Sequence, residues 1–243
     1  MNSIVMNRIR MTACLFLWLG GLFSSYACLA ASHVDGLTPE QSARDVKILK
    51  RTLLEMHPAL TKYRSQADIE AAFMRFEARG NAARSAADMY LAASEMAAAI
   101  RCGHTWTNVL NQEGASKSTL LEIADKLPFT LMLVANRWLV MASADAAVET
   151  GDEILAVNGM KAADMITAMM PYLRADGSSD GKRLRQLSHN RGDFSQMDII
   201  WPLLSPPRNG RYNVDIRRVA GKREALSVAA TTLAQRDRAL AAQ

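Results

Sequence analysis

The hydrophobic pattern of the sequence changes near Lys126, and this change constrains the fold class. Before it, apolar residues recur at the three- and four-residue spacing of amphipathic helices. After it, apolar residues gather in short segments that are typical of strands. A helical part followed by strands, one helix and further strands predicts an α+β fold.

Three helices are predicted between residues 38 and 103. Each is preceded by a hydroxyl residue three positions before an acidic or amide side chain, which is the pattern of an N-terminal capping box. The predicted capping residues are Thr38, Ser65 and Ser85. A glycine follows the second and the third helix, and we expect left-handed C-caps at Gly80 and Gly103.

The second half of the protein predicts a small β-barrel or sandwich that contains one helix. The predicted strands are residues 129–134, 138–141, 154–157 and 212–219, and the predicted helix is 160–173.

The first thirty residues have the layout of a secretory signal. Arg8 and Arg10 precede an acid-free apolar run over 13–23, and small residues follow around Ala27 and Ala30. The run is too short to span a bilayer. We therefore expect cleavage near Ala30, a periplasmic or secreted protein, and no stable membrane span after the signal is removed.

Removal of this signal changes the cysteine count and the charge. Cys14 and Cys28 leave with it, so that Cys102 remains alone and no internal disulfide can form. The signal carries two arginines and no acid, which lowers the formal net charge from +5 to +3. Because no basic block is interleaved with aromatic residues, nucleic acid is not an expected partner.

The sequence lacks the motifs of metal and nucleotide sites. Its histidines form no His-Glu-x-x-His pair, and the mature protein has one cysteine. No Walker loop or Gly-x-Gly-x-x-Gly segment is present. We therefore expect neither a metal ion nor a cofactor.

Residues 151–159, with the sequence GDEILAVNG, form the most specific motif of the protein. Taken alone, the motif predicts a turn, a strand and a tight Asn-Gly turn. It also resembles the GDxIxxxNG core of PDZ domains, in which the strand and turn precede a helix. PDZ domains bind extended peptides or protein C-termini as an added strand. The resemblance implies a PDZ-like domain and a polypeptide partner.

A second motif, RCGHTWT at residues 101–107, follows the third predicted helix. A histidine in this place can simply cap the helix, because an imidazolium interacts favourably with the C-terminal end of the helix dipole. A packed or capping His104 is therefore the structural interpretation of this motif.

The order of the motifs resembles that of S41 peptidases, the tail-specific or C-terminal processing serine proteases. The shared segments are His57-Pro58, Gly103-His104-Thr105, the PDZ-like motif, 171–173 (PYL) and Asp176-Gly177, within a match over about residues 40–220. The processing proteases use a serine activated by a lysine, whereas some relatives use a serine, a histidine from the N-terminal region and an acid. His104 matches that histidine, so the resemblance implies that His104 is a general base.

The family's catalytic serine lies in a core downstream of the PDZ module, and this chain ends at Gln243. None of the nearby serines, Ser178, Ser179, Ser188 and Ser195, lies in a Gly-x-Ser-x-Gly elbow. The nucleophile is therefore absent, and we expect the chain alone to be inactive.

Two main interpretations follow. In the first, the chain is the N-terminal and PDZ portion of an exported S41-like serine peptidase that hydrolyses peptide bonds when complete. The expected parts are a signal peptide (1–30), a helical domain (31–122), a PDZ-like domain (123–222) and a tail (223–243) leading toward an absent catalytic core. In the second, it is a non-catalytic, exported PDZ-like protein that binds peptides or protein C-termini. An adaptor role in an envelope assembly is a third possibility.

Overall fold

The computed structural model describes residues 36–109, 118–189 and 195–243. The predicted signal peptide lies outside these residues, which belong to one compact unit spanning Asp35–Gln243. Within the described ranges, none of the helices combines the length and the apolar character that are needed to cross a bilayer.

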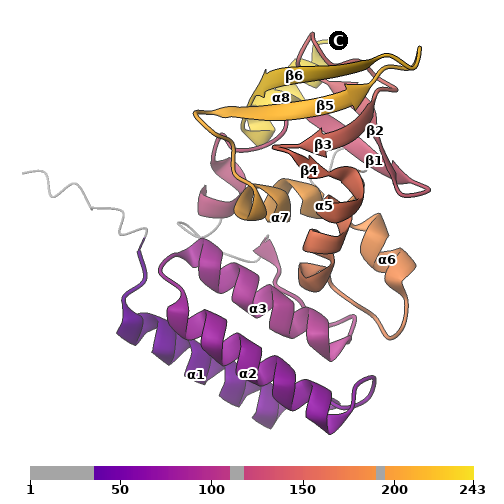
Figure 1. The fold of residues 1–243 in the computed structure, drawn as a ribbon. Helices are drawn as coiled ribbons and strands as arrows, with labels where there is room; N and C mark the ends of the chain where they lie inside the picture. The colour runs from indigo at the N-terminus through magenta and orange to yellow at the C-terminus, as the bar shows by residue number, and fades with distance from the viewer. Residues whose placement is uncertain (1–35, 110–117, 190–194) are drawn as a thin grey trace, which may run out of the picture. The chain divides into compact units, whose positions relative to one another are not determined.

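Three helices form the N-terminal part and lie side by side (Figure 1). They are α1 (Pro39–Met56), α2 (Gln66–Ala82) and α3 (Ala86–Ile100). The predicted caps are confirmed, because the Thr38, Ser65 and Ser85 side chains each accept a hydrogen bond from the backbone N–H three residues later. One hydrophobic cluster fills the space between the helices, with Phe73, Phe76, Met96 and Ile100 in its centre.

The predicted C-caps at Gly80 and Gly103 are wrong. Gly80 lies inside α2, where a Cβ atom would come within 2.4 Å of the Val46 side chain on α1. A glycine is therefore required there for close helix packing rather than for a turn. The left-handed C-cap of α3 is Arg101, with φ of 58°.

One antiparallel sheet forms the rest of the core, and it confirms the predicted α+β fold. Its strands are β1 (Phe129–Val134), β2 (Arg137–Ser143), β3 (Glu153–Val157), β4 (Met160–Lys161), β5 (Arg211–Arg217) and β6 (Arg223–Ala229). Their order is β1-β2-β3-β5-β6, with β4 paired to β3. The four predicted strands are all present, whereas β6 was not predicted.

Two helices pack between the sheet and α3, as Figure 1 shows. They are α5 (Ala162–Met169), which continues into the 3₁₀ turn η3 (Met170–Tyr172), and α7 (Gln196–Leu204). Buried side chains from the strands and from both helices, such as Trp138, Ile154, Met165 and Ile200, share one hydrophobic cluster. The remaining helical segments are η2 (Ser118–Glu122), α6 (Asp180–Arg185) and α8 (Leu233–Ala241).

The polar residues of the GDEILAVNG motif hold β3 to its neighbours. Asp152 is buried, and its carboxylate accepts hydrogen bonds from the Glu149 backbone (2.9 Å) and from Arg218 Nη1 (2.8 Å). Asn158 has φ of 51°, and its Oδ1 accepts a bond from the Asn213 backbone (3.2 Å). The motif therefore has a complete structural role in this fold.

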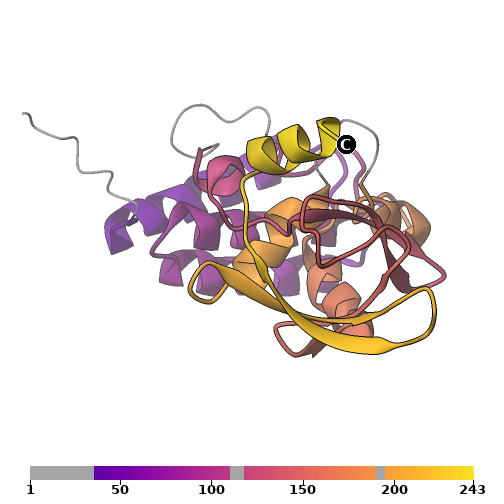
Figure 2. The same ribbon diagram turned by 90° about the horizontal axis from the view of Figure 1, so that it is seen from above.

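Residues 223–243 provide β6 and α8. The backbone runs from the end of β6 across to α8, which ends near the C-terminus (Figure 2). Lys126 and Thr231 exchange backbone hydrogen bonds of 2.9 and 3.0 Å beside this connection. The domain boundaries proposed from the sequence stay a prediction.

Candidate functional site

The motif segments His57-Pro58 and Gly103-His104-Thr105 meet in the structure. His57 follows the last residue of α1, and its Nδ1 accepts a hydrogen bond from the Ala59 backbone (3.2 Å). This bond leaves the ring proton on Nε2, which lies 2.9 Å from Thr105 Oγ1 and donates to it. His57 thereby ties the end of α1 to the loop that carries His104.

The segment Asp176-Gly177 packs against the same loop from the other side. A Cβ atom on Gly103 would lie 2.7 Å from Asp176 Cγ, so that only glycine permits this approach. Gly177 donates a backbone hydrogen bond to the Arg101 carbonyl (2.8 Å), and Arg101 Nε donates one to the Gly177 carbonyl (2.5 Å). The loop after α3 and the segment after η3 therefore each donate a hydrogen bond to the other.

Charge stabilises this junction. Lys182 Nζ lies 2.9 Å from Asp176 Oδ2, and Arg101 Nη2 lies 3.1 Å from Asp180 Oδ1. The Lys182 ammonium lowers the pKa of Asp176, and the Gly103 N–H and the nearby His104 contribute smaller effects in the same direction. The mixed-charge segment 176–185 thus contacts the helical part.

His104 lies at this junction with its side chain exposed to solvent. No hydrogen bond joins its imidazole to another described residue, so its ring is accessible and does not cap a helix by a side-chain bond. Its role as a general base stays a prediction, because no serine hydroxyl among the described residues is bonded to it.

A Ser-His-Asp grouping does occur elsewhere, but its geometry is not that of a catalytic triad. His189 Nε2 lies 2.9 Å from Asp198 Oδ2 and 3.4 Å from Ser195 Oγ, so the acid and the hydroxyl face the same ring nitrogen. In a triad the two partners occupy different nitrogens. All three side chains are buried, and Ser195 Oγ accepts a bond from Met197 N–H at the start of α7. The grouping is a structural network.

This network closes the outer edge of β1. The Leu131 carbonyl accepts a hydrogen bond from the His189 backbone (2.8 Å), and Leu131 N–H donates to His189 Nδ1 (2.9 Å). Leu133 N–H donates to Ser188 Oγ (3.0 Å). The backbone N–H and carbonyl of Leu131 and the N–H of Leu133 are therefore already satisfied by the protein itself and are not free to pair with an added strand.

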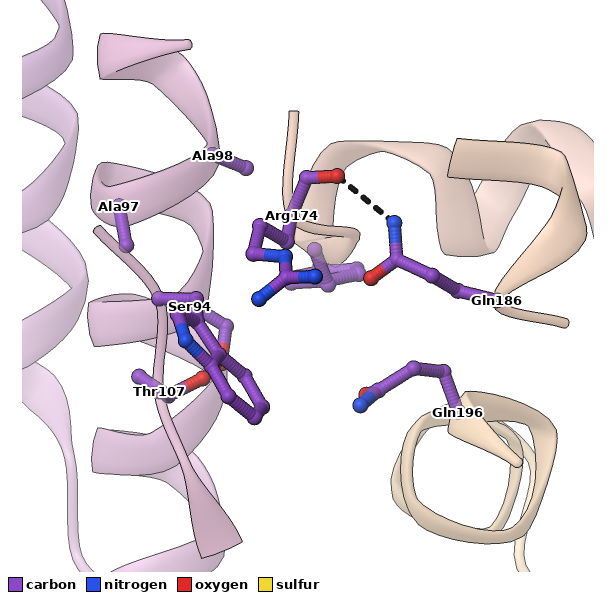
Figure 3. A pocket seen from close by; sticks show the side chains of 9 residues that line it. Ser94, Ala97, Ala98, Thr107, Arg174, Gln186 and Gln196 are labelled. Carbon is purple, nitrogen blue, oxygen red and sulfur yellow. Dashed lines mark hydrogen bonds between the residues drawn. The ribbon is translucent and has the colours of Figure 1, made fainter. Parts of the chain in front are cut away.

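A small cavity adjoins the His104 loop (Figure 3). Arg174 points into it, with its guanidinium 4.8 Å from the centre of the Trp106 ring. Ser94 Oγ and Thr107 Oγ1 form a 2.6 Å hydrogen bond on the α3 side, and Gln186 and Gln196 lie opposite. Sequence reasoning missed this group, because its members come from five segments and carry no shared motif.

No metal site is evident at this junction or elsewhere in the described ranges, where no cluster of three or more histidine, cysteine or acidic side chains is placed to hold an ion. Cys102 beside the site is a free thiol.

No protein-family model and no curated protein matches the sequence. Solved structures do match, among them the S499A mutant of CPAF and mature CPAF complexed with lactacystin. For each, the TM-score is 0.51 at 14% identity, over 79% of this chain and 34% of the CPAF chain. CPAF is a chlamydial serine protease. The protein therefore shares its fold with part of CPAF and spans about a third of the length of the CPAF chains that it matches.

Proposed function

We propose that this chain is the N-terminal and PDZ-like part of an exported S41-like serine peptidase. The observation that carries the proposal is the convergence of His57, the Gly103–Thr105 segment and Asp176-Gly177 around an exposed His104. These segments are separate in sequence, and each belongs to the S41-like motif order. The CPAF-like fold agrees with this assignment.

In the proposed reaction, a serine from another part of the longer protein attacks the peptide carbonyl. His104 accepts the hydroxyl proton of that serine and then donates it to the leaving amine, a role for which imidazole is suited near neutral pH. His57 and Asp176 hold the loop that carries His104. The PDZ-like part would present the polypeptide.

The test is substitution of His104 in the longer protein. We expect His104→Ala to abolish peptide hydrolysis while the circular dichroism spectrum and the thermal midpoint stay unchanged. The purified chain described here should not cleave an unstructured peptide. Unaltered turnover in the variant, or cleavage by this chain alone, would contradict the proposal.

The alternative is a non-catalytic protein that binds peptides or protein C-termini at a sheet edge. The outer edge of β1 is closed by Ser188 and His189, which disfavours strand addition there. The other edge strand, β6, pairs only with β5 among the described residues, and this observation favours it as an edge for peptide binding. Titration of an extended peptide, followed by the backbone amide signals of β6 and β1, would show which edge binds.

A further inference from the structure

Arg174 is a guanidinium without a counterion in the part of the protein that the structure describes. Among the described residues, every other arginine that is at least partly buried forms an ion pair; these are Arg64, Arg101, Arg183, Arg217, Arg218 and Arg236. Arg174 forms none, and its Nε is buried without a hydrogen-bond partner. Because a buried donor without a partner destabilises the fold, this arrangement requires an explanation.

Its neighbours hold the guanidinium in place without neutralising it. Trp106 provides a ring face for stacking, and cation–π contact of this kind leaves the edge of the guanidinium free. Gln186 Nε2 donates to the Arg174 backbone carbonyl (2.7 Å) and so fixes the segment from which the side chain extends. Figure 3 shows the guanidinium between the α3 side of the cavity and the two glutamine side chains.

The lining can bind an anion but offers no negative charge. The residues around the cavity supply hydroxyl groups, amide groups and the guanidinium, and none of them is acidic. The enclosed volume is about 10 Å³, which admits one water-sized group. A ligand therefore inserts only a small terminal group and remains outside with its other atoms. Trp106, 36% exposed, lies at the accessible side.

We infer that Arg174 and Trp106 form a binding site for a carboxylate of a polypeptide. One carboxylate oxygen fits the space beside the guanidinium and accepts a charge-assisted N–H hydrogen bond there, and the charge of the group supplies the missing counterion. The carboxylate comes from the C-terminus of a polypeptide or from an aspartate or glutamate side chain. Trp106 and Thr107 directly follow His104 and Thr105, so that a peptide held here passes close to the proposed base. The inference rests on the proposed function and deepens it by adding a substrate determinant.

Four short peptides test the site and distinguish the two sources. The first pair is acetyl-tetra-alanine with a free or an amidated C-terminus. The second pair is amidated acetyl-Ala-Glu-Ala-Ala and its glutamine counterpart. Binding to the protein is measured by calorimetry and by the indole N–H signal of Trp106. We expect at least one charged peptide to bind at least about tenfold more tightly than its neutral counterpart, as loss of one charge-assisted contact predicts.

Two arginine variants locate the binding. Arg174→Gln should weaken binding of the charged peptide by about tenfold or more. Arg185→Gln removes the same charge from an exposed arginine that pairs with no described acid, and it should leave binding unchanged. The proposed site would be refuted by equal affinity for the two peptides of each pair, by no binding of any peptide, or by an equal loss of affinity in Arg174→Gln and Arg185→Gln.

The peptide pairs compare ligands on the unaltered protein, so a misfolded variant does not obscure the result. Because binding and not hydrolysis is measured, failure here leaves the proposed peptidase function to its own test.

Discussion

Replacement of Arg236 should destabilise the protein more than any surface substitution. Arg236 is 1% exposed and donates to both carboxylate oxygens of Asp198, at 2.7 and 3.0 Å. The same carboxylate accepts bonds from His189 Nε2 (2.9 Å) and from the Ser195 backbone (3.2 Å). This network joins α8, α7 and the outer edge of β1.

The magnitude follows from leaving a charge buried without its partner. Arg236→Met retains most of the apolar volume but leaves the Asp198 carboxylate uncompensated, and breaking a buried pair in this way costs about 3–5 kcal/mol. A domain is stable by about 5–15 kcal/mol in total. We therefore expect the urea midpoint to fall by about 1–5 M, given slopes of about 1–3 kcal/mol per M. Adding Asp198→Asn should recover at least half of the loss.

The stability that Asp198 contributes depends on pH in a defined direction. Burial raises the pKa of Asp198, but hydrogen bonds from His189 and Arg236 outweigh it and hold the pKa well below the usual range. A depressed carboxyl pKa gives stability that is present above the unfolded value of about 3.9 and is lost as pH falls below it. In Arg236→Met protonation relieves the unpaired charge, so the gap between the two proteins should narrow as pH falls toward about 3.

Urea unfolding monitored by circular dichroism and by the fluorescence of buried Trp201 measures these differences at several pH values. The ion-pair reasoning would be refuted by a loss below about 1 kcal/mol near neutral pH, or by a double variant that is less stable than Arg236→Met.

Two further predictions concern the site and the sheet edge. Gly103→Ala should lower the free energy of unfolding by about 1–3 kcal/mol, because its methyl group overlaps Asp176. Gly181→Ala is the control: no described atom lies within 4 Å of the added methyl group, so this variant should be as stable as the unaltered protein or slightly more stable in urea unfolding. Equal effects of the two substitutions would contradict the close-packing role of Gly103. Ser188→Ala should speed amide hydrogen exchange at Leu133, whose N–H loses its acceptor, and an unchanged exchange rate would show that Ser188 does not close the β1 edge.

The sequence predicted the elements whose signals are local. The capping boxes at Thr38 and Ser65 involve residues three positions apart, and the predicted caps formed. The strand at Phe129–Val134 was also visible as a local run. β6 was missed, because its alternate residues Ala225 and Ser227 are small and exposed and give a weak strand signal.

For the candidate site too, the sequence predicted some features and the structure alone revealed others. Motif order singled out His57, the Gly103–Thr105 segment and Asp176, but the sequence did not show that His57 bonds to Thr105 or that Asp176 requires Gly103. Gly80 showed the opposite error, since a residue expected to end a helix serves the contact between two helices.

By itself, then, the sequence determined the α+β class, the helix starts, most strands and the motif residues, because capping and periodicity depend on neighbours within a few positions. Only the tertiary structure decided that His189 closes the edge of β1 and that Arg174 stacks on Trp106 with no counterion among the described residues. Those contacts join distant segments, and packing of the whole core selects which distant side chains meet.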